Sequence, residues 1–253
     1  MKKSFLFQMN YLVEVKKLKK NYGSKEAVNG ISFNIEEDQI LGLLGPNGSG
    51  KTTTIGMLLG LLKPSAGEIK INKMNFENKR IDILSKINFI SPYIELPKKL
   101  TVKQNLTVYG KLYNIIDLKE RIEYLTEELR LEDLLNRVTG ELSSGQKNRA
   151  SLAKALINKP KVLFLDEPTA SLDPEIGDFV RSFLETYKKE NKISILLASH
   201  NMNEVTRLCK SILMMKDGVI IDKGNPNELI TKHGRKNLEE VFLKLSRNNN
   251  ESY

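Results

Sequence analysis

The segment at residues 45–52, GPNGSGKT, constrains this chain more than any other, because it matches the pattern G-x-x-x-x-G-K-[ST] at every fixed position. An apolar run, ILGLLG at 40–45, precedes it, and KTTTIGMLLGLL at 51–62 follows it until Pro64. The first run predicts a buried parallel strand and the second predicts a helix. Glycines at such a turn let backbone N–H groups close around phosphate oxygens, and the positive end of the helix dipole adds to the attraction. The segment therefore predicts a phosphate-binding loop in an α/β fold.

Two side chains of this loop suit a nucleoside triphosphate. Lys51 is placed to reach the β- and γ-phosphates, and Thr52 offers its hydroxyl to Mg²⁺. A purely structural glycine-rich turn would explain the glycines, but it would not require the lysine and the threonine. We expect nucleotide contacts along the whole loop, from Gly45, Pro46, Asn47, Gly48, Ser49, Gly50, Lys51, Thr52 and Thr53.

The rest of the chain alternates between strand-like and helix-like segments, as in an α/β domain. Segments 11–18 and 31–37 alternate in polarity and predict half-exposed antiparallel strands. A helical pattern from Thr101 to about Arg137 interrupts the strands. We therefore expect a P-loop NTPase core with a mixed sheet, an N-terminal antiparallel β subdomain and an inserted α-helical subdomain. The other expected elements are strands at 67–72, 86–91, 162–166 and 193–199, helices at 144–158 and about 175–190, and a hairpin at 211–222 that turns at Asp217-Gly218.

These elements predict a single domain over residues 10–245, with the helical subdomain inserted at about 93–158 and a polar tail at 246–253. A hydrophobic fraction of 40% and a charged fraction of 28% are ordinary for a globular chain and exclude a disordered or collagen-like one. The single cysteine, Cys209, excludes an intrachain disulfide framework and a thiolate metal cluster. The two histidines lie too far apart in sequence for a local zinc pair, so we expect no structural metal.

The apolar stretches are all far shorter than the roughly 20 residues that a membrane-spanning helix needs. The first residues, MKKSFLFQMNYLVEV, resemble a signal peptide superficially, but Gln8 and Asn10 interrupt the apolar run and Glu14 follows at once. We interpret them as a short basic start before a first strand. The sequence thus predicts a soluble, cytoplasmic protein.

Two adjacent carboxylates end the apolar segment VLFLDE at 162–167. A carboxylate at the C-terminal end of a buried parallel strand emerges where ligands bind. Asp166 is expected to hold Mg²⁺ and Glu167 to poise the attacking water; the alternative, a solvated strand end, is weaker beside a phosphate-binding loop. Adjacent residues of a strand point to opposite sides, so both can serve one site only if the chain turns there, and Pro168 is a turn signal.

A further motif, LSSGQ at 142–146, leads to a family. Together with GPNGSGKTT, FLDEPTASLD at 164–173 and LLASH at 196–200, it resembles an ATP-binding cassette (ABC) ATPase over residues 11–245. At the start of the helix expected there, an ordinary Ser N-cap is the alternative to an anion site. In the family this site closes on the γ-phosphate bound to a second cassette, so that two ATP molecules are held in a head-to-tail dimer. The residues to which the resemblance gives this role are Ser143, Ser144, Gly145 and Gln146.

The resemblance implies roles for three further residues. Tyr22 corresponds to the aromatic that stacks on adenine, although before the family is considered it could equally be a strand-end aromatic that caps the core. Asp173 corresponds to the loop that contacts the partner cassette, and His200 to the histidine that touches the γ-phosphate and orients the catalytic groups. His233 has no such context and is given no role.

One position departs from the family pattern. Pro92 stands where the family carries a glutamine that reaches Mg²⁺ and the water and links the site to the helical subdomain. Proline has neither a side-chain acceptor nor a backbone N–H, and the nearest polar groups are those of Ser91 and Tyr93. The departure predicts altered Mg²⁺ ligation and altered coupling, with nucleotide binding retained.

The resemblance implies an ATPase subunit, with ATP and Mg²⁺ as cofactors, that powers a transporter through a separate transmembrane permease. It implies a homodimer, or a pair with a related ATPase subunit, held at the inner face of the cell membrane by the permease. The segment NLEEVFLKLSR at 237–247 resembles the ending of single-cassette exporter subunits, which favours export. A net charge of +9 suits an anionic membrane surface.

Two alternatives remain. A soluble ABC protein that acts on ribosomes or DNA would also explain the basic charge, but two cassettes or a long coiled coil would be expected there, and no nucleic-acid partner is expected here. A weakly hydrolysing regulatory module is the other, and Pro92 favours it. The chain nevertheless retains the family's residues for hydrolysis, which argues against such a module; these are Lys51, Asp166, Glu167 and His200.

Overall fold

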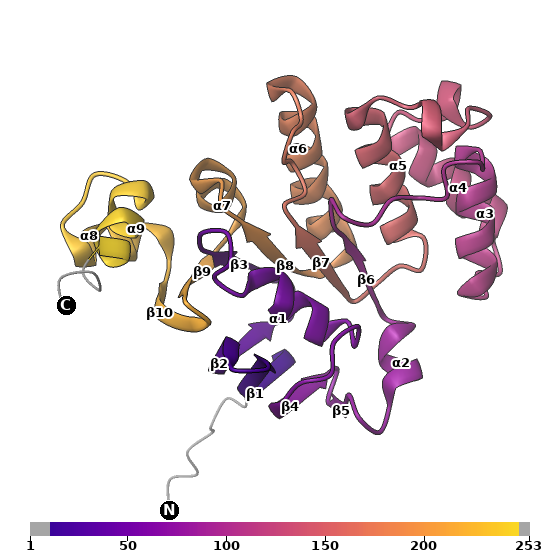
Figure 1. Ribbon diagram of the computed structural model, residues 1–253. Helices are drawn as coiled ribbons and strands as arrows, with labels where there is room; N and C mark the ends of the chain where they lie inside the picture. The colour runs from indigo at the N-terminus through magenta and orange to yellow at the C-terminus, as the bar shows by residue number, and fades with distance from the viewer. Residues whose placement is uncertain (1–10, 248–253) are drawn as a thin grey trace, which may run out of the picture.

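The computed structural model describes residues 11–247 of the chain and shows two β-sheets with helices between and beside them (Figure 1). The smaller sheet has the strand order β2-β1-β4-β5, and every pairing in it is antiparallel. Its strands are β1 (Tyr11–Tyr22), β2 (Lys25–Glu36), β4 (Ala66–Ile71) and β5 (Met74–Asn75). The expected N-terminal antiparallel subdomain is therefore confirmed.

The larger sheet has the order β10-β9-β3-β8-β7-β6. Strands β3, β6, β7, β8 and β9 pair in parallel, and β10 is an antiparallel edge strand, so the expected mixed sheet is confirmed. Its strands are β3 (Ile40–Leu44), β6 (Ile87–Ile90), β7 (Val162–Asp166), β8 (Ser194–Ser199), β9 (Ser211–Lys216) and β10 (Val219–Gly224).

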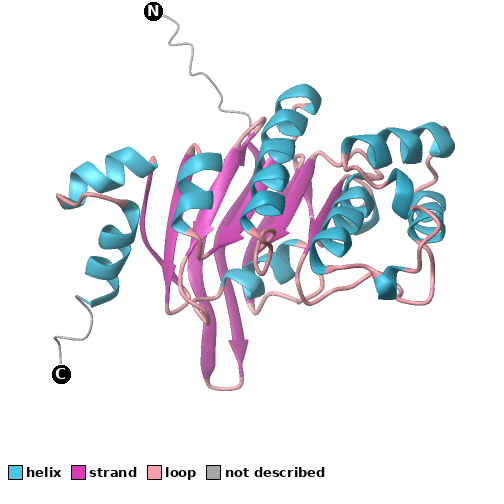
Figure 2. Ribbon diagram, turned by 90° about the horizontal axis from the view of Figure 1, so that it is seen from above, coloured by secondary structure: helices cyan, strands magenta, loops and turns pink. Residues whose placement is uncertain are grey.

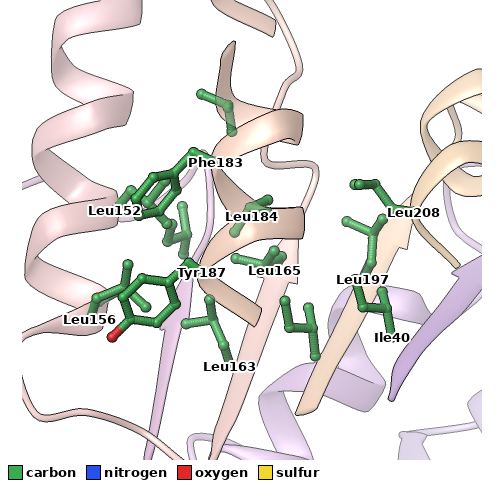
Figure 3. Packing of buried hydrophobic residues seen from close by; sticks show 14 of the residues in the cluster. Ile40, Leu152, Leu156, Leu163, Leu165, Phe183, Leu184, Tyr187, Leu197 and Leu208 are labelled. Carbon is green, nitrogen blue, oxygen red and sulfur yellow. The ribbon is translucent and has the colours of Figure 1, made fainter. Parts of the chain in front are cut away.

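Helices cover both faces of the larger sheet, which explains why its central strands are apolar on both sides. On one face α1 (Lys51–Leu58) lies between the two sheets, and Leu41 and Leu43 of β3 pack there. On the other face lie α5 (Ser144–Leu156), α6 (Pro174–Asn191) and α7 (Met202–Leu208). Figure 3 shows this second core, with labelled side chains Ile40, Leu152, Leu156, Leu163, Leu165, Phe183, Leu184, Tyr187, Leu197 and Leu208.

The inserted helical part stands beside the sheet and is formed by the segment between β6 and β7 (Figures 1 and 2). It holds α3 (Val102–Leu112), α4 (Leu118–Glu128), two 3₁₀ helices at 132–134 and 139–141, and α5. Thr101 caps α3, since its hydroxyl accepts from the N–H of Gln104 while the Gln104 side chain accepts from the N–H of Thr101. The expected insertion of helices into one α/β core is confirmed.

Some boundaries differ from the expectation. Helix α1 ends at Leu58 rather than near residue 62, because Gly60 adopts a left-handed conformation (φ 66°) and the N–H of Leu62 bonds to the carbonyl of Gly56. Elements without a clear sequence signal are β5, α2 (Arg80–Leu84), α7 and α8 (Pro226–His233). Helix α9 (Leu238–Arg247) runs two residues into the segment expected as a polar tail, and the rest of that segment lies outside the described residues.

Among the described residues, no helix combines the length and the apolar character that a membrane crossing requires.

Candidate nucleotide-binding and catalytic site

Three neighbouring strands of the larger sheet, β3, β8 and β7, bring the chemistry-bearing residues to one edge. They run parallel, and their register pairs Leu44 with Ser199 and Ala198 with Asp166. The carboxyl ends of parallel strands meet at the edge where α/β proteins bind ligands. The phosphate-binding loop follows the first strand, His200 the second and Glu167 the third. The tertiary structure thus joins three motifs that are far apart in sequence.

At two positions of the loop, only glycine fits the folded chain. A Cβ at Gly45 would lie 2.3 Å from the carbonyl oxygen of Met215, and one at Gly50 would lie 2.6 Å from that of Ala27. Gly50 also has φ 104° and precedes the first turn of α1. Gly48 has φ 81° but would meet no atom within 4 Å, so its backbone faces open space.

Lys51 lies inside the loop with only 5% of its surface exposed. Its Nζ donates to the carbonyl oxygens of Gly45 (2.7 Å) and Pro46 (3.1 Å). Burial lowers the pKa of Lys51, and the charges of Glu167 and Asp166 act in the opposite direction. A cationic amine is therefore held beside two carboxylates at the strand ends.

Thr52 and Asp166 form the second link between motifs. The Thr52 hydroxyl donates to Oδ2 of Asp166 at 3.0 Å. The pKa of Asp166 is raised, mainly because the carboxyl is buried and also because of the negative charge of Glu167. The hydrogen bond from Thr52 and the charge of Lys51 act in the opposite direction. A hydroxyl and a carboxylate are hard oxygen ligands that fit Mg²⁺, which commonly takes one or two protein oxygens and completes its shell with phosphate and water.

Glu167 shares the site with Asp166 because the chain turns at Glu167 itself. Strand β7 ends at Asp166, and Glu167 has φ 51°, one residue before the expected turn signal at Pro168. The N–H of Glu167 donates to the carbonyl of Ala198 (2.8 Å), and its own carbonyl accepts from Ala170 (3.1 Å). This left-handed residue explains how two consecutive carboxylates reach one edge of the sheet.

The carboxylate of Glu167 meets the segment after β8. Its Oε1 lies 2.7 Å from Nδ1 of His200, and its Oε2 accepts a longer hydrogen bond (3.4 Å) from the hydroxyl of Ser199. The Glu167 side chain is 15% exposed and the His200 side chain 60%. The imidazole is thus open to solvent on one side and bound to the carboxylate on the other.

The LSSGQ segment forms the N-terminus of α5. Ser143 caps the helix: its hydroxyl accepts from the N–H of Gln146 (3.3 Å), and Gln146 Oε1 accepts from the N–H of Ser143 (3.0 Å). Within one chain, then, Ser143 has the capping role that was the alternative to an anion site. Ser143 and Ser144 are exposed, whereas a Cβ at Gly145 would press against Ile176 of α6 at 3.2 Å.

The other expected site residues lie apart from this cluster. Tyr22 ends β1 with 48% of its surface exposed, and Nζ of Lys20 lies 5.1 Å from its ring centre. Asp173 is exposed and caps α6 by accepting from the N–H of Ile176 (2.9 Å). Within the described part of the chain, no hydrogen bond or ion pair joins Tyr22, Ser143 or Asp173 to Lys51, Asp166 or Glu167.

Pro92 is exposed just after β6. The hydroxyl of Ser91 accepts a long hydrogen bond (3.4 Å) from the N–H of Tyr93. Among the described residues, it forms no hydrogen bond with Thr52, Asp166 or Glu167. Ser91, Pro92, Ser144 and Glu167 all line one cavity of about 200 Å³ between β6, the helical part and β7. The segment that departs from the family pattern therefore shares a cavity with the candidate catalytic carboxylate.

Sequence reasoning missed four side chains that hold the site together. They are Ser199, Thr169, Glu204 and Asn148. The hydroxyl of Thr169 donates to Glu204 (2.7 Å), and the amide of Asn148 donates to the carbonyl of Pro168 (2.7 Å). None of them has a spacing that points to chemistry; only their place inside or near the LSSGQ, FLDEPTASLD and LLASH segments could have drawn attention to them.

Comparison with known proteins places this chain in a family. The profile described as "ABC transporter" matches residues 28–170. Nod factor export ATP-binding protein I of Paraburkholderia xenovorans (strain LB400) is 36% identical over 91% of this chain and 76% of that protein. Bacitracin transport ATP-binding protein BcrA of Bacillus licheniformis is 35% identical over 91% of this chain and 75% of its own length.

A solved structure shows the same fold. The dimeric ATP-binding cassette MJ0796, in a post-hydrolysis state bound to ADP and Pi, superimposes with a TM-score of 0.77 at 25% identity, covering 84% of this chain and 98% of that one. The chain described here belongs to the ABC transporter family. It is an ATP-binding subunit of that family and an ATPase, as the resemblance of its motifs implied.

Proposed function

We propose that this chain hydrolyses ATP to power export through a separate membrane permease, at the site formed by the ends of β3, β7 and β8. The observation that carries the proposal is the convergence of five side chains at this edge: Lys51, Thr52, Asp166, Glu167 and His200. Thr52 is bonded to Asp166 (3.0 Å), His200 lies against Glu167 (2.7 Å), and Lys51 is held inside the loop by the carbonyl of Gly45 (2.7 Å). The names of the two relatives, one an export protein and one a transport protein, support the direction and the class of function.

The residues divide the chemistry of phosphoryl transfer to water among themselves. The loop N–H groups and Lys51 hold the phosphates and neutralise charge as it develops on the γ-phosphoryl oxygens. Glu167 accepts the hydrogen of the attacking water and fixes its line of approach. His200, with a proton on both ring nitrogens, would donate from Nδ1 to Glu167 and from Nε2 to the γ-phosphate. Thr52 and Asp166 would hold Mg²⁺, which when bound neutralises phosphate charge.

A second copy, or a related subunit, completes the site. The exposed Ser143 and Ser144 lie at the positive end of the 13-residue helix α5 and would bind the γ-phosphate held by the partner chain. Asp173 and its loop would contact the partner, and Tyr22 would stack on adenine. The dimeric arrangement of MJ0796 with ADP and Pi supports this assembly.

An exposed apolar groove is the proposed contact with the permease. It lies where α2 and the segment after α1 meet the end of α3, has a volume of about 360 Å³, and is lined by Leu61, Ile81 and Leu112. These three side chains are 60%, 83% and 71% exposed, which is unusual for so many large apolar residues at one place. The groove joins the sheet core to the helical part, so an occupant would sense their relative position. Through it the subunit would sit at the inner face of the cell membrane.

Site-specific crosslinking tests the permease contact. The natural thiol, Cys209, is buried, and burial raises its pKa, so it reacts poorly with thiol crosslinkers. Leu112→Cys introduces an accessible thiol in the groove. In membranes of the cells that naturally produce the chain, it should crosslink to a protein that mass spectrometry identifies as having several membrane-spanning segments.

The matched control is Leu243→Cys, at a residue that is 42% exposed. It lies on α9, and Figure 1 shows this helix at the opposite end of the molecule from α2 and α3. A membrane protein captured equally by both variants, or by neither, would contradict the proposed contact. Crosslinking of Leu112→Cys to ribosomal proteins would support the soluble alternative instead.

A further inference from the structure

Glu204 is a buried carboxylate beside the catalytic groups to which no motif assigns a role. It lies in the first turn of α7 and is 1% exposed. Its Oε1 accepts a hydrogen bond of 2.7 Å from the hydroxyl of Thr169, 35 positions earlier in the chain. Since Thr169 is two residues beyond Glu167, this bond ties the loop after β7 to the helix that follows His200.

The surroundings of Glu204 make it an unusual structural residue. Burial raises its pKa, hydrogen bonds from Ser199 and Thr169 lower it, and the charges of Glu167 and Arg181 act in opposite directions. Within the described part of the chain it has no ion-pair partner. A buried carboxylate that only hydroxyls satisfy costs stability, and an apolar side chain would fill the same space at less cost.

Ser199 links the candidate catalytic carboxylate to the start of α7. Its hydroxyl donates a long hydrogen bond (3.4 Å) to Oε2 of Glu167. Its oxygen accepts from the N–H of Asn201 (3.0 Å), which fixes its place at the end of β8. The side chain of Asn201 in turn caps α7, because its Oδ1 accepts from the N–H of Glu204 (3.2 Å). The backbone segment that carries His200 is therefore tied both to Glu167 and to the helix that carries Glu204.

The loop after β7 is held on two sides. Glu204 of α7 binds Thr169, and Asn148 of α5 donates to the carbonyl of Pro168 (2.7 Å). Between them the loop keeps its own turn, in which the N–H of Leu172 donates to the carbonyl of Thr169 (3.3 Å). A shift of Thr169 would move Glu167 on one side and Asp173 on the other.

We propose that Glu204 is a positioning residue for ATP hydrolysis: by holding Thr169 it fixes the loop after β7, and so it sets the Glu167 carboxylate against His200. The proposal rests on the proposed role of Glu167. Glu204 is only 1% exposed, so its loss should leave ATP binding intact and slow the hydrolytic step.

The test compares kcat, KM for ATP and the thermal midpoint in the full-length chain. Thr169→Val removes the donor at constant shape and should lower kcat by about tenfold with KM unchanged within about twofold. Glu204→Ala should lower kcat by about ten- to a hundredfold, and Glu204→Gln, which keeps an acceptor for Thr169, should recover part of the loss. The double variant Glu204→Ala, Thr169→Val should be no slower than Glu204→Ala alone, because the two changes remove the same hydrogen bond.

Asp222→Asn is the matched control, since it weakens a carboxylate bound to His233 (2.6 Å) and Lys232 (2.7 Å) near the C-terminus and outside the site. It should lower the thermal midpoint and leave kcat unchanged. Wild-type kcat in folded Thr169→Val and Glu204→Ala would overturn the proposal. So would a loss of kcat in Asp222→Asn as large as theirs at an equal loss of thermal midpoint, because lower stability would then explain the slower turnover. Wild-type turnover in Glu167→Gln would instead overturn the catalytic role of Glu167, so the two failures are distinguishable.

Discussion

Nδ1 of His200 lies 2.7 Å from Oε1 of Glu167, although 33 positions separate the two residues. The contact follows from two features: β7 and β8 are parallel neighbours in a register that pairs Asp166 with Ala198, and the chain turns at Glu167 with φ 51°. The His200 side chain remains 60% exposed in this pair. The geometry suits a carboxylate that accepts a proton from water and a histidine that orients it.

Glu167→Gln is expected to keep the shape of the site and remove its negative charge. The hydrolytic step should lose several kcal/mol of stabilisation, about 10²- to 10³-fold in turnover, while ATP still binds. The variant should accumulate as an ATP-bound dimer on a sizing column. Hydrolysis at the wild-type rate would show that another group activates the water.

The proposed composite site can be tested by mixing two inactive variants. Lys51→Ala should abolish phosphate binding, whereas Ser143→Asp keeps an N-cap for α5 but repels the γ-phosphate of the partner. An equal mixture should recover roughly a quarter of wild-type turnover, because half the dimers are mixed and each has one intact site. No recovery in the mixture, or turnover that stays linear in protein concentration down to full dilution, would exclude the dimer.

Pro92→Gln tests the departure from the family pattern. We expect weak hydrolysis by the isolated wild-type subunit, because water or Ser91 must replace the glutamine amide, and a water-mediated contact is less well positioned. The substitution should raise turnover and lower the Mg²⁺ concentration for half-maximal activity. If neither quantity changes, with or without the membrane partner, the loop does not limit catalysis.

Lys154 predicts a pH dependence of stability. Its Nζ donates to the carbonyl of Phe89 (3.1 Å), with the ring centres of Phe89 and Tyr109 at 4.8 and 5.5 Å, and burial lowers its pKa to about 8. The unfolded lysine keeps its proton to about pH 10.4, so between these values the unfolded state binds more protons and stability rises with pH. Below pH 8 the full cost of the buried charge is present.

Lys154→Met should therefore raise the free energy of unfolding by about 1–2 kcal/mol at pH 7, and the gain should shrink towards pH 10. Urea unfolding of wild type and variant at several pH values measures the difference. Lys119→Met, at a side chain that is 88% exposed, is the control and should give a small, constant difference. A difference for Lys154→Met that is equally constant would contradict the buried, destabilised charge.

The family and most of the helices and strands can be predicted from the sequence, because they depend on local patterns. The glycines of residues 45–50 match a loop whose backbone leaves no room for a Cβ at two of its positions. The apolar runs 40–45 and 162–166 predicted parallel strands covered on both faces, and helices do cover both. The ABC family follows from the order of the motifs alone.

Features that depend on contacts between distant segments become visible only in the folded chain. That Asp166 and Glu167 serve one edge follows from a left-handed residue, which no side-chain pattern signals in a glutamate. The hydrogen bonds of Ser199 and Glu204 to the loop after β7 follow from strand order, since β7 and β8 become neighbours only in the folded sheet. Local propensity acts over a few residues, whereas these hydrogen bonds join positions more than 30 apart, and only packing brings them within reach.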